Sequence, residues 1–323
     1  MPKKIGIVTS HPNVFKNYFP TLAEPTLVPS ELSFTPDDQL VINELRIHGF
    51  DVVPVIWGVD ATLLRDHDLL IVRSPWDYMD TPANCTAFMT WLSAVEKSGV
   101  KILNTPALMH WLLDKHYLLD LNDQGIDIVP TQYLKSGTVF NLAKHFHAHR
   151  AFVMKPCISA AGLGLYYIKS LVDAKLYQKE ITQRLSTCDY MLQAFVPEIR
   201  TKGEWSLVFL GGKYSHGLHK KPAKNSIFVH AERGGSLNLD VVPPQPVLDF
   251  ATQAYSRIKP AFEKATGHIC HEKDILYMRL DIIDTLYGPV LMECEGVEPE
   301  LFFRASPESV AQFCKSVILA IQT

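Results

Sequence analysis

The sequence predicts an α/β protein that folds into two or three lobes. Its 323 residues exceed the size at which a single hydrophobic core usually stops growing. The first part of the chain alternates strand-like and helix-like segments, and the last part contains a strand pair joined by a tight turn. The composition, 47% hydrophobic and 20% charged, is that of a soluble globular protein.

Charge and composition exclude several classes of function. The net charge is −3 and no long basic run occurs, so we expect no nucleic-acid partner. Six cysteines without C-x-x-C spacing indicate a reducing compartment and disfavour a disulfide framework or a zinc motif. The N-terminus lacks the length and cleavage site of a signal peptide. No stretch approaches the ~20 apolar residues that span a bilayer, so we expect a cytoplasmic protein with no membrane partner.

The first lobe begins with a buried strand at residues 4–9, followed by a long loop over 13–34 with prolines from Pro20 onward. Thr35 is an N-cap candidate, and Pro36 in the first turn strengthens the prediction of a helix that ends near Ile47. The remaining predicted elements of this lobe are strands at 51–57, 68–72 and 100–103 and helices at 82–97 and 106–121. Lys115 and His116 fall on the last of these helices.

Polar and aromatic residues follow the third strand, in the segment Arg73-Ser74-Pro75-Trp76-Asp77-Tyr78. Ligands of open α/β sheets bind at the carboxyl ends of strands. The segment is therefore a candidate substrate site. The alternative is a loop packed by its aromatic side chains, in which Arg73 and Asp77 pair with each other.

The central lobe begins near Thr131 and contains a candidate phosphate site. A strand at residues 152–156 carries Lys155 and leads into the small-residue loop Cys157–Leu165, of sequence CISAAGLGL. Consecutive backbone N–H groups in such a loop can surround phosphate oxygens. The segment matches neither G-x-x-x-x-G-K-[ST] nor G-x-G-x-x-G. A small-residue loop is more often a hairpin, but the preceding lysine favours phosphate binding.

Three further strands are expected between the central lobe and the C-terminal helices. Residues 190–198 form a strand that leaves the central lobe through a proline hinge. Gly211-Gly212 predicts a two-residue hairpin turn between strands at 204–210 and 213–217. Helices are expected at 247–266 and 307–321, and the second of these has an amphipathic pattern.

A pair of strands near the C-terminus, residues 277–283 and 290–295, carries clustered carboxylates. Asp281 lies on the first strand, and Glu293 and Glu295 lie on the second. Because side chains alternate along a strand, paired strands would present all three on one face beside Arg279. Three close carboxylates repel one another unless a cation neutralises them, and oxygen ligands suit magnesium. A solvated charged face is the alternative, but the surrounding residues are apolar.

These segments carry a resemblance that spans nearly the whole chain. They are VRSPWDY, DKHYLLDL, IDIVPT, VMKP with its SAAG loop, LQAFVPEI, GEWSLVFLGGKYSHGLHKKPA, MRLDII and LMECEGVEPELF. In order and number they resemble the ATP-grasp superfamily of carboxylate–amine ligases. That superfamily includes D-alanine–D-alanine ligase, glutathione synthetase and the ligases that add glutamate to ribosomal proteins. Within it, the chain is most similar to the cyclo-ligases of cycloserine biosynthesis that act on O-ureido-D-serine.

The resemblance implies an ATP-grasp fold preceded by an α/β domain. The implied domains are residues 1–115 on the substrate side, 116–196 as the central lobe and 197–323 as the lobe with the metal carboxylates. The implied activity is that of an ADP-forming C–N ligase that uses ATP and magnesium, or manganese in its place. A small amino-acid-like carboxylate becomes an acyl-phosphate, and an amine then attacks it or closes a ring. Relatives are often dimers or tetramers, which leaves a homo-oligomer open.

The resemblance also implies a role for individual residues. ATP would be held by Lys115, Lys155, Ser159, Ala160, Ala161, Gly162, Gln193, Phe195, Val196 and Glu204. The metal would be held by Asp281, Glu293 and Glu295. Arg279, Lys220 and Arg233 would act on the transferring phosphoryl group. The substrate would lie against Ser10, Arg73, Trp76, Asp77 and Glu298.

The chain departs from its relatives at two positions. Phe228 stands where relatives often carry an arginine, and we expect the nearby Arg233 to be the candidate replacement. Glu295 stands where many relatives have asparagine. Two other classes of function stay open, a phosphotransferase on the same scaffold and a non-catalytic nucleotide-binding protein. The complete set of Lys155 and metal carboxylates disfavours the second.

Overall fold

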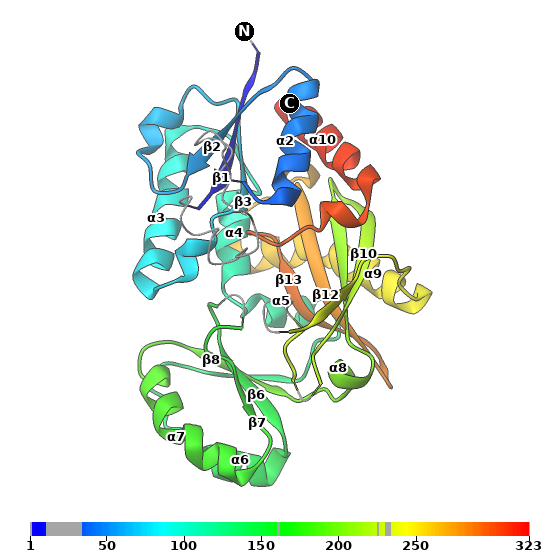
Figure 1. Ribbon diagram of the computed structural model, residues 1–323. Helices are drawn as coiled ribbons and strands as arrows, with labels where there is room; N and C mark the ends of the chain where they lie inside the picture. Colours follow the sequence, from blue (N-terminus) through cyan, green and yellow to red (C-terminus); the bar gives the residue numbers. More distant parts are fainter. Residues whose placement is uncertain (1, 11–33, 160–161, 225, 230–233, 323) are drawn as a thin grey trace.

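The computed structural model describes residues 2–10, 34–159, 162–224, 226–229 and 234–322. Figure 1 shows three sheets with helices packed against them, which confirms the predicted α/β class. Within the described ranges, no helix has the length and apolar character needed to cross a membrane. The predicted loop over 13–34 lies almost entirely outside the described residues.

The first sheet is parallel and has helices on both faces. Its strands, in spatial order, are β2 (Asp51–Ile56), β1 (Lys4–Thr9), β3 (Leu69–Ser74) and β4 (Ile102–Leu103). Helix α2 (Pro36–Ile47) packs on the face that includes Ile5 and Ile7, and α3 (Pro82–Ser98) packs on the opposite face. The Thr35 hydroxyl accepts a hydrogen bond from the Asp38 amide at 3.0 Å, so the predicted N-cap is confirmed.

The helix predicted over 106–121 is wrong as a single element. The chain forms α4 (Pro106–Leu113) and α5 (Tyr117–Asp123), with a break between them. At the break, Asp114 has extended backbone angles and its carboxylate accepts a hydrogen bond from the His116 amide at 3.1 Å. An aspartate side chain that bonds nearby backbone competes with helical hydrogen bonding. Lys115 therefore lies in a turn, where its amide donates to the Cys157 carbonyl at 2.9 Å.

The central sheet is antiparallel and forms a separate lobe, drawn in green in Figure 1. Its strands, in spatial order, are β5 (Thr131–Leu134), β8 (Tyr190–Ala194), β6 (Phe152–Pro156) and β7 (Tyr166–Ile168). Helices α6 (Leu142–His149) and α7 (Leu171–Leu185) pack on the face that carries Phe152 and Met154. Since side chains alternate along β6, Val153 and Lys155 project from the other face.

The third sheet carries the predicted carboxylate strands. Its order is β11 (Ser236–Asn238), β10 (Lys213–Lys221), β9 (Glu204–Leu210), β12 (Tyr277–Thr285) and β13 (Gly288–Glu295). Helix α9 (Gln245–Thr266) packs on the face that includes Met278, Leu280 and Ile282. Among the described residues, two further α-helices are α8 (Glu198–Thr201) and α10 (Pro307–Gln322). Gly211 and Gly212 both have positive φ, and this confirms the predicted hairpin turn.

The first and third sheets are joined through shared cores and a buried asparagine. Side chains of both sheets contribute to the same two hydrophobic clusters. The central lobe has a cluster of its own and adds Met191 and Cys157 to the larger of the shared ones. Asn104, which is fully buried, donates to the carbonyls of Tyr277 at 2.9 Å and Gly296 at 2.7 Å. Its side-chain oxygen accepts from the Leu276 amide at 2.6 Å. The Asn104 side chain thus provides hydrogen-bond partners for backbone groups at the start of β12 and just after β13.

We predict that Asn104→Ala lowers the free energy of unfolding by roughly 3 kcal/mol or more, because it leaves several buried polar groups without partners. Urea denaturation measures the change. Asn43→Ala is the matched control, since Asn43 is exposed on α2 and its loss should change stability by less than about 0.5 kcal/mol. Equal effects of the two substitutions would contradict the role assigned to Asn104.

Candidate active site

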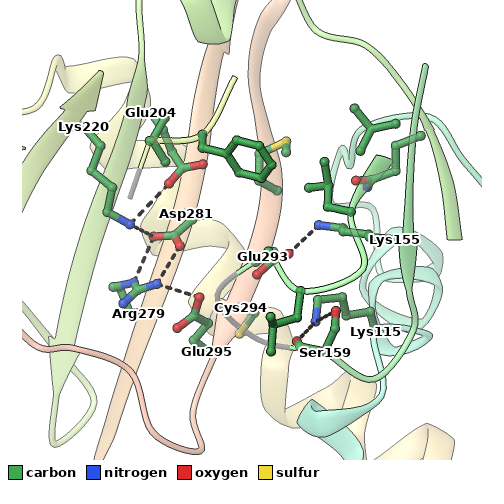
Figure 2. Close-up of a pocket in the computed structure, with 18 of the residues that line it drawn as sticks. Lys115, Lys155, Ser159, Glu204, Lys220, Arg279, Asp281, Glu293, Cys294 and Glu295 are labelled. Atoms are coloured by element: carbon green, nitrogen blue, oxygen red, sulfur yellow. Dashed lines mark hydrogen bonds and ion pairs between the residues drawn. The ribbon is translucent and has the colours of Figure 1, made fainter. Parts of the chain in front are cut away.

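A cavity of about 650 Å³ lies between the central lobe and the rest of the molecule. One wall comes from the open face of the central sheet, and the opposite wall comes from the carboxylate face of the third sheet (Figure 2). The volume falls in the range of pockets that bind small molecules. The predicted site residues that line it are Trp76, Lys115, Lys155, Ser159, Gly162, Gln193, Phe195, Val196, Glu204, Lys220, Arg279, Asp281, Glu293, Glu295 and Glu298.

The predicted pairing of the carboxylate strands is confirmed. Arg279 lies opposite Glu295, and Asp281 lies opposite Glu293. Residues directly opposite each other in an antiparallel pair project from the same face. All four side chains therefore point into the cavity, away from α9, as the alternation of β12 requires.

Two cations neutralise the carboxylates on this wall. Arg279 contacts both oxygens of Asp281, at 3.0 and 2.9 Å, and one oxygen of Glu295 at 2.6 Å. The Lys220 ammonium lies 3.3 Å from Glu204 and 3.5 Å from Asp281. Figure 2 shows the five side chains as one continuous network. A bidentate arginine fixes the carboxylate in both position and orientation.

Burial and neighbouring charges shift the acids of this wall in different directions. Burial favours a raised pKa for Asp281, but Arg279 and Lys220 hold the pKa well below its usual range. Burial raises the pKa of Glu295, although Arg279 partly offsets the effect. Burial also raises the pKa of Glu204 to about 7, against the influence of Lys220. The wall thus combines a firmly ionised carboxylate with two that ionise less readily.

The opposite wall contributes two lysines. Lys155, from β6, forms an ion pair with Glu293 across the cavity. Burial favours a raised pKa for Glu293, but Lys155 and Lys115 lower it to about 2. The Lys115 ammonium donates to the backbone carbonyl of Ser159. The cavity therefore receives cations from segments that lie far apart in the sequence.

The loop after β6 is described only in part. Ser159 and Gly162 line the cavity, and Gly162 has a positive φ of 66°. Ala160 and Ala161 lie outside the described residues, and so does Arg233.

The hinge end of the cavity is mostly apolar. Gln193 is buried and donates to the Thr131 hydroxyl at 3.0 Å. The Phe195 amide donates to the Ala151 carbonyl at 3.2 Å. Apolar side chains that line the cavity include Val153, Leu165, Ile199, Ile227, Phe228, Val229, Ile283 and Met292. The flat faces of an aromatic ring system such as a nucleobase would suit these apolar surroundings.

The structure separates the predicted substrate residues. Trp76 and Glu298 line the main cavity, and the Trp76 ring nitrogen donates to the Glu298 carbonyl at 3.2 Å. Arg73 lines a second cavity of about 240 Å³ and pairs with Asp38 at 2.9 Å, not with Asp77 as the alternative supposed. Ser10 and Asp77 are absent from the lining of both cavities.

Tyr78, which was not predicted as a site residue, forms a contact with Glu298 at the substrate side. The Tyr78 hydroxyl donates to the Glu298 carboxylate at 2.7 Å, and both residues line the main cavity. Burial, with a smaller contribution from the nearby Glu295, raises the pKa of Glu298 to about 7, and the Tyr78 hydrogen bond opposes this shift. Tyr78 belongs to the quoted VRSPWDY segment, but no spacing in the sequence connects it to a residue 220 positions later.

Comparison with solved structures defines the class of fold. The chain matches the ATP-grasp ligase PsnB, solved in complex with a minimal precursor, Mg and ADP, with a TM-score of 0.55. The match has 14% sequence identity and covers 99% of this chain and 98% of PsnB. The fold is therefore that of the ATP-grasp ligases, as the motifs predicted.

A more similar relative is DcsG. The crystal structure of D-cycloserine synthetase DcsG matches with a TM-score of 0.77 and 20% identity, over 98% of this chain and 99% of DcsG. The cycloserine biosynthesis protein DcsG of Streptomyces lavendulae is 26% identical over 264 residues, 77% of this chain and 82% of that protein. Residues 18–104 match the model of the DcsG N-terminal domain. The chain is homologous to DcsG.

We predict that the stability difference between the wild type and Glu298→Gln depends on pH. The pKa of Glu298 is about 7 in the folded protein, against an ordinary value of 4.5. The folded state therefore binds this proton more tightly, and the stability of the wild type falls as pH rises from about 4.5 to about 7. Glu298→Gln should lack this pH-dependent contribution to the free energy of unfolding. Urea midpoints of both proteins across this range measure it, and parallel curves would contradict the raised pKa.

Proposed function

We propose that this protein is an ATP- and magnesium-dependent ligase that forms an acyl-phosphate from a small amino-acid-like carboxylate. An amine then displaces phosphate, either from a second molecule or from the same one with ring closure. Homology to DcsG and the fold shared with the ATP-grasp ligases support the ADP-forming C–N ligase class. The observation that supports the proposal most directly is the cavity itself, where four cationic side chains lie close to clustered carboxylates. The cationic residues are Lys115, Lys155, Lys220 and Arg279.

The residues present fit magnesium. Asp281, Glu293 and Glu295 offer oxygen ligands from one sheet face, and low pKa values keep Asp281 and Glu293 ionised. Hard carboxylate oxygens are the ligands that magnesium prefers, together with phosphate oxygens. When bound, magnesium would neutralise charge on the transferring phosphoryl group. Manganese has the same preference for oxygen ligands.

The ion pairs of the cavity suggest how the chain would receive ATP. Lys155 pairs with Glu293, so a metal ion on Glu293 would release the lysine to bind a phosphate oxygen. Lys115 contacts the Ser159 carbonyl. It would thereby hold the small-residue loop after β6 close to Lys155. Each cation would exchange one anionic or polar partner for another, which limits the cost of desolvation on binding.

Arg279 and Lys220 are the proposed stabilisers of the developing negative charge. Both are buried at the cavity wall, where low dielectric strengthens their field. In this proposal Gln193, Phe195 and Val196 hold the adenine end and Glu204 the ribose. Trp76 and Glu298 hold the substrate. Ser10, Arg73 and Asp77 are proposed as further residues of the substrate site. The proposed domains are residues 1–115, 116–196 and 197–323.

We propose ring closure as the favoured form of the reaction, because the cycloserine biosynthesis protein DcsG matches this chain in sequence and, with a TM-score of 0.77 against 0.55 for PsnB, in structure. A phosphotransferase is the second candidate. The same ATP residues would serve it, with a hydroxyl group as acceptor in place of an amine.

We predict that Glu293→Gln lowers magnesium-dependent turnover at least 100-fold while the fold stays intact, since it removes a charged metal ligand and the partner of Lys155. ADP release in the presence of candidate amino acids measures turnover, and circular dichroism checks the fold. Glu96→Gln is the control, because Glu96 is exposed on α3. Retained activity of Glu293→Gln would remove this residue from the metal site.

The product separates the two candidate activities. We expect equal amounts of ADP and inorganic phosphate together with a new amide or ring, measured by phosphate release and mass spectrometry. ADP with a stable phosphorylated product would establish the phosphotransferase instead.

Arg233, proposed to replace the arginine missing at Phe228, has its own test. Arg233→Ala should lower turnover far more than it lowers nucleotide affinity. Unchanged kinetics would reject the replacement.

A further inference from the structure

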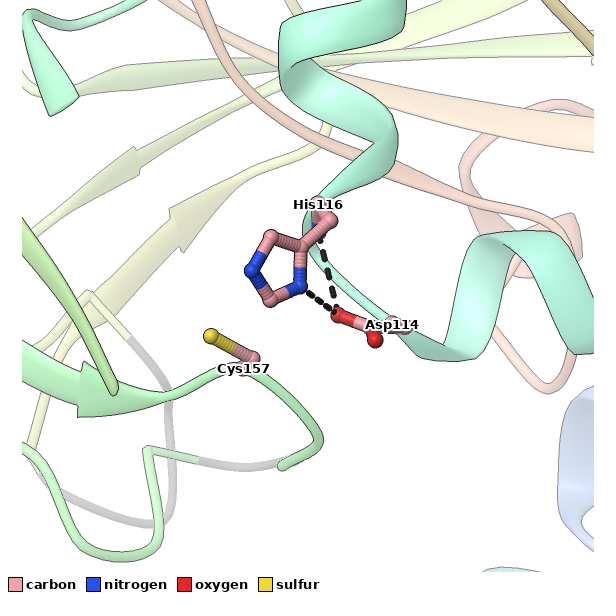
Figure 3. A group of neighbouring side chains, drawn as sticks. All are labelled: Asp114, His116 and Cys157. Carbon is pink, nitrogen blue, oxygen red and sulfur yellow. Dashed lines mark hydrogen bonds and ion pairs between the residues drawn. The ribbon is translucent and has the colours of Figure 1, made fainter. Parts of the chain in front are cut away.

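A second cluster of chemically active side chains lies outside the proposed active site. Asp114 and His116 come from the break between α4 and α5, and Cys157 follows β6. One potential ligand atom from each lies within 4.8 Å of the others. Figure 3 shows the Cys157 sulfur pointing toward the imidazole ring of His116. None of the three residues lines the main cavity.

The imidazole of His116 is held in one orientation. Its Nδ1 lies 2.6 Å from the Asp114 carboxylate, and the ring stacks on Tyr133 with centroids 4.3 Å apart. A nitrogen that faces a carboxylate carries the proton, so Nε2 keeps its lone pair. Within the described part of the chain, no hydrogen bond engages Nε2 or the Cys157 sulfur. The ring therefore presents an electron pair on the side away from Asp114.

The same three residue types could form a nucleophilic triad, but this site does not suit one. Burial raises the pKa of the Cys157 thiol to about 12, so the thiolate that a nucleophilic mechanism needs is scarce at neutral pH. A metal ion differs from a substrate in this respect, because it displaces the thiol proton when it binds. Neither of the two cavities is lined by the thiol, so neither would bring a substrate to it. A metal ion needs far less room, and the half-exposed side chains of His116 and Asp114 leave a path from solvent.

We propose that Cys157 Sγ and His116 Nε2 bind a thiophilic divalent cation of the zinc type. Asp114 would fix the ring through Nδ1, an arrangement that recurs among metal-bound histidines, and water would complete the coordination. Sulfur and imidazole ligands favour zinc over magnesium. The site is therefore chemically distinct from the carboxylate face of the third sheet.

Binding here would act on the segment that carries Lys115. That residue lies between Asp114 and His116, and its amide already donates to the Cys157 carbonyl. Its side chain reaches the Ser159 carbonyl, two residues beyond the cysteine. A metal ion would add a third link between this turn and the segment that follows β6. Because it binds only the folded arrangement, it should raise the melting temperature.

Cobalt is the probe, since it takes the same ligands as zinc and absorbs light. Reduced, chelator-treated protein is titrated with Co²⁺ in the presence of excess magnesium. We expect a thiolate-to-cobalt charge-transfer band in the near ultraviolet that saturates at one equivalent and disappears when Zn²⁺ is added. Cys157→Ser should abolish the band, and Asp114→Asn should weaken cobalt affinity about 10- to 100-fold.

Cys188→Ser is the matched control, because Cys188 is exposed in the same lobe and its loss should leave the band unchanged. Glu293→Gln should also keep the band, which separates this site from the proposed magnesium site. His116→Gln gives a second loss variant should Cys157→Ser fail to fold. No band in the wild type, or a band that persists in Cys157→Ser and His116→Gln, would overturn the proposal.

Discussion

The buried pair of Arg279 and Asp281 is the interaction on which the rest of the site depends. Strand alternation sends both side chains into the cavity, where charged groups are stable only if they are paired. The bidentate contact fixes Asp281, and the same arginine reaches Glu295. Lys220 then extends the network to Glu204. A single sheet face thus becomes a rigid, charged wall instead of a set of mobile side chains.

The division of the molecule into cores explains where the cavity lies. The first and third sheets share hydrophobic clusters and are joined by Asn104, whereas most of the central lobe's core is a cluster of its own. The central lobe contacts the rest of the molecule through Met191 and Cys157, which belong to the largest shared cluster. The Lys155–Glu293 ion pair crosses the cavity between them, and a charged ligand could take the place of either partner of that pair.

Much of the fold was predictable because local patterns and tertiary packing agree. Alternation predicted β12 and β13, the Thr35-Pro36 pair predicted the start of α2, and Gly211-Gly212 predicted the hairpin. The prediction failed between α4 and α5, where the helical pattern continues through residues 106–121. There a single side chain, Asp114, bonds to the backbone and breaks the helix. Helix propensity is summed over many residues. It therefore does not reveal where one side chain competes with helical hydrogen bonds for a backbone amide.

Alternation along the strands predicts, without any structure, that Asp281, Glu293 and Glu295 share a face with Arg279. The order of residues likewise places Lys155 ahead of a small-residue loop. Which charges pair, in contrast, depends on how the segments pack together. In the folded protein Lys155 pairs with Glu293, and Arg73 pairs with Asp38. Tyr78 bonds to Glu298, and Cys157 lies beside His116. The physical reason is the distance along the chain over which each effect acts. Periodicity fixes directions within one element, whereas ion pairs and metal ligands depend on distances of a few ångströms between segments that only the packed fold brings together.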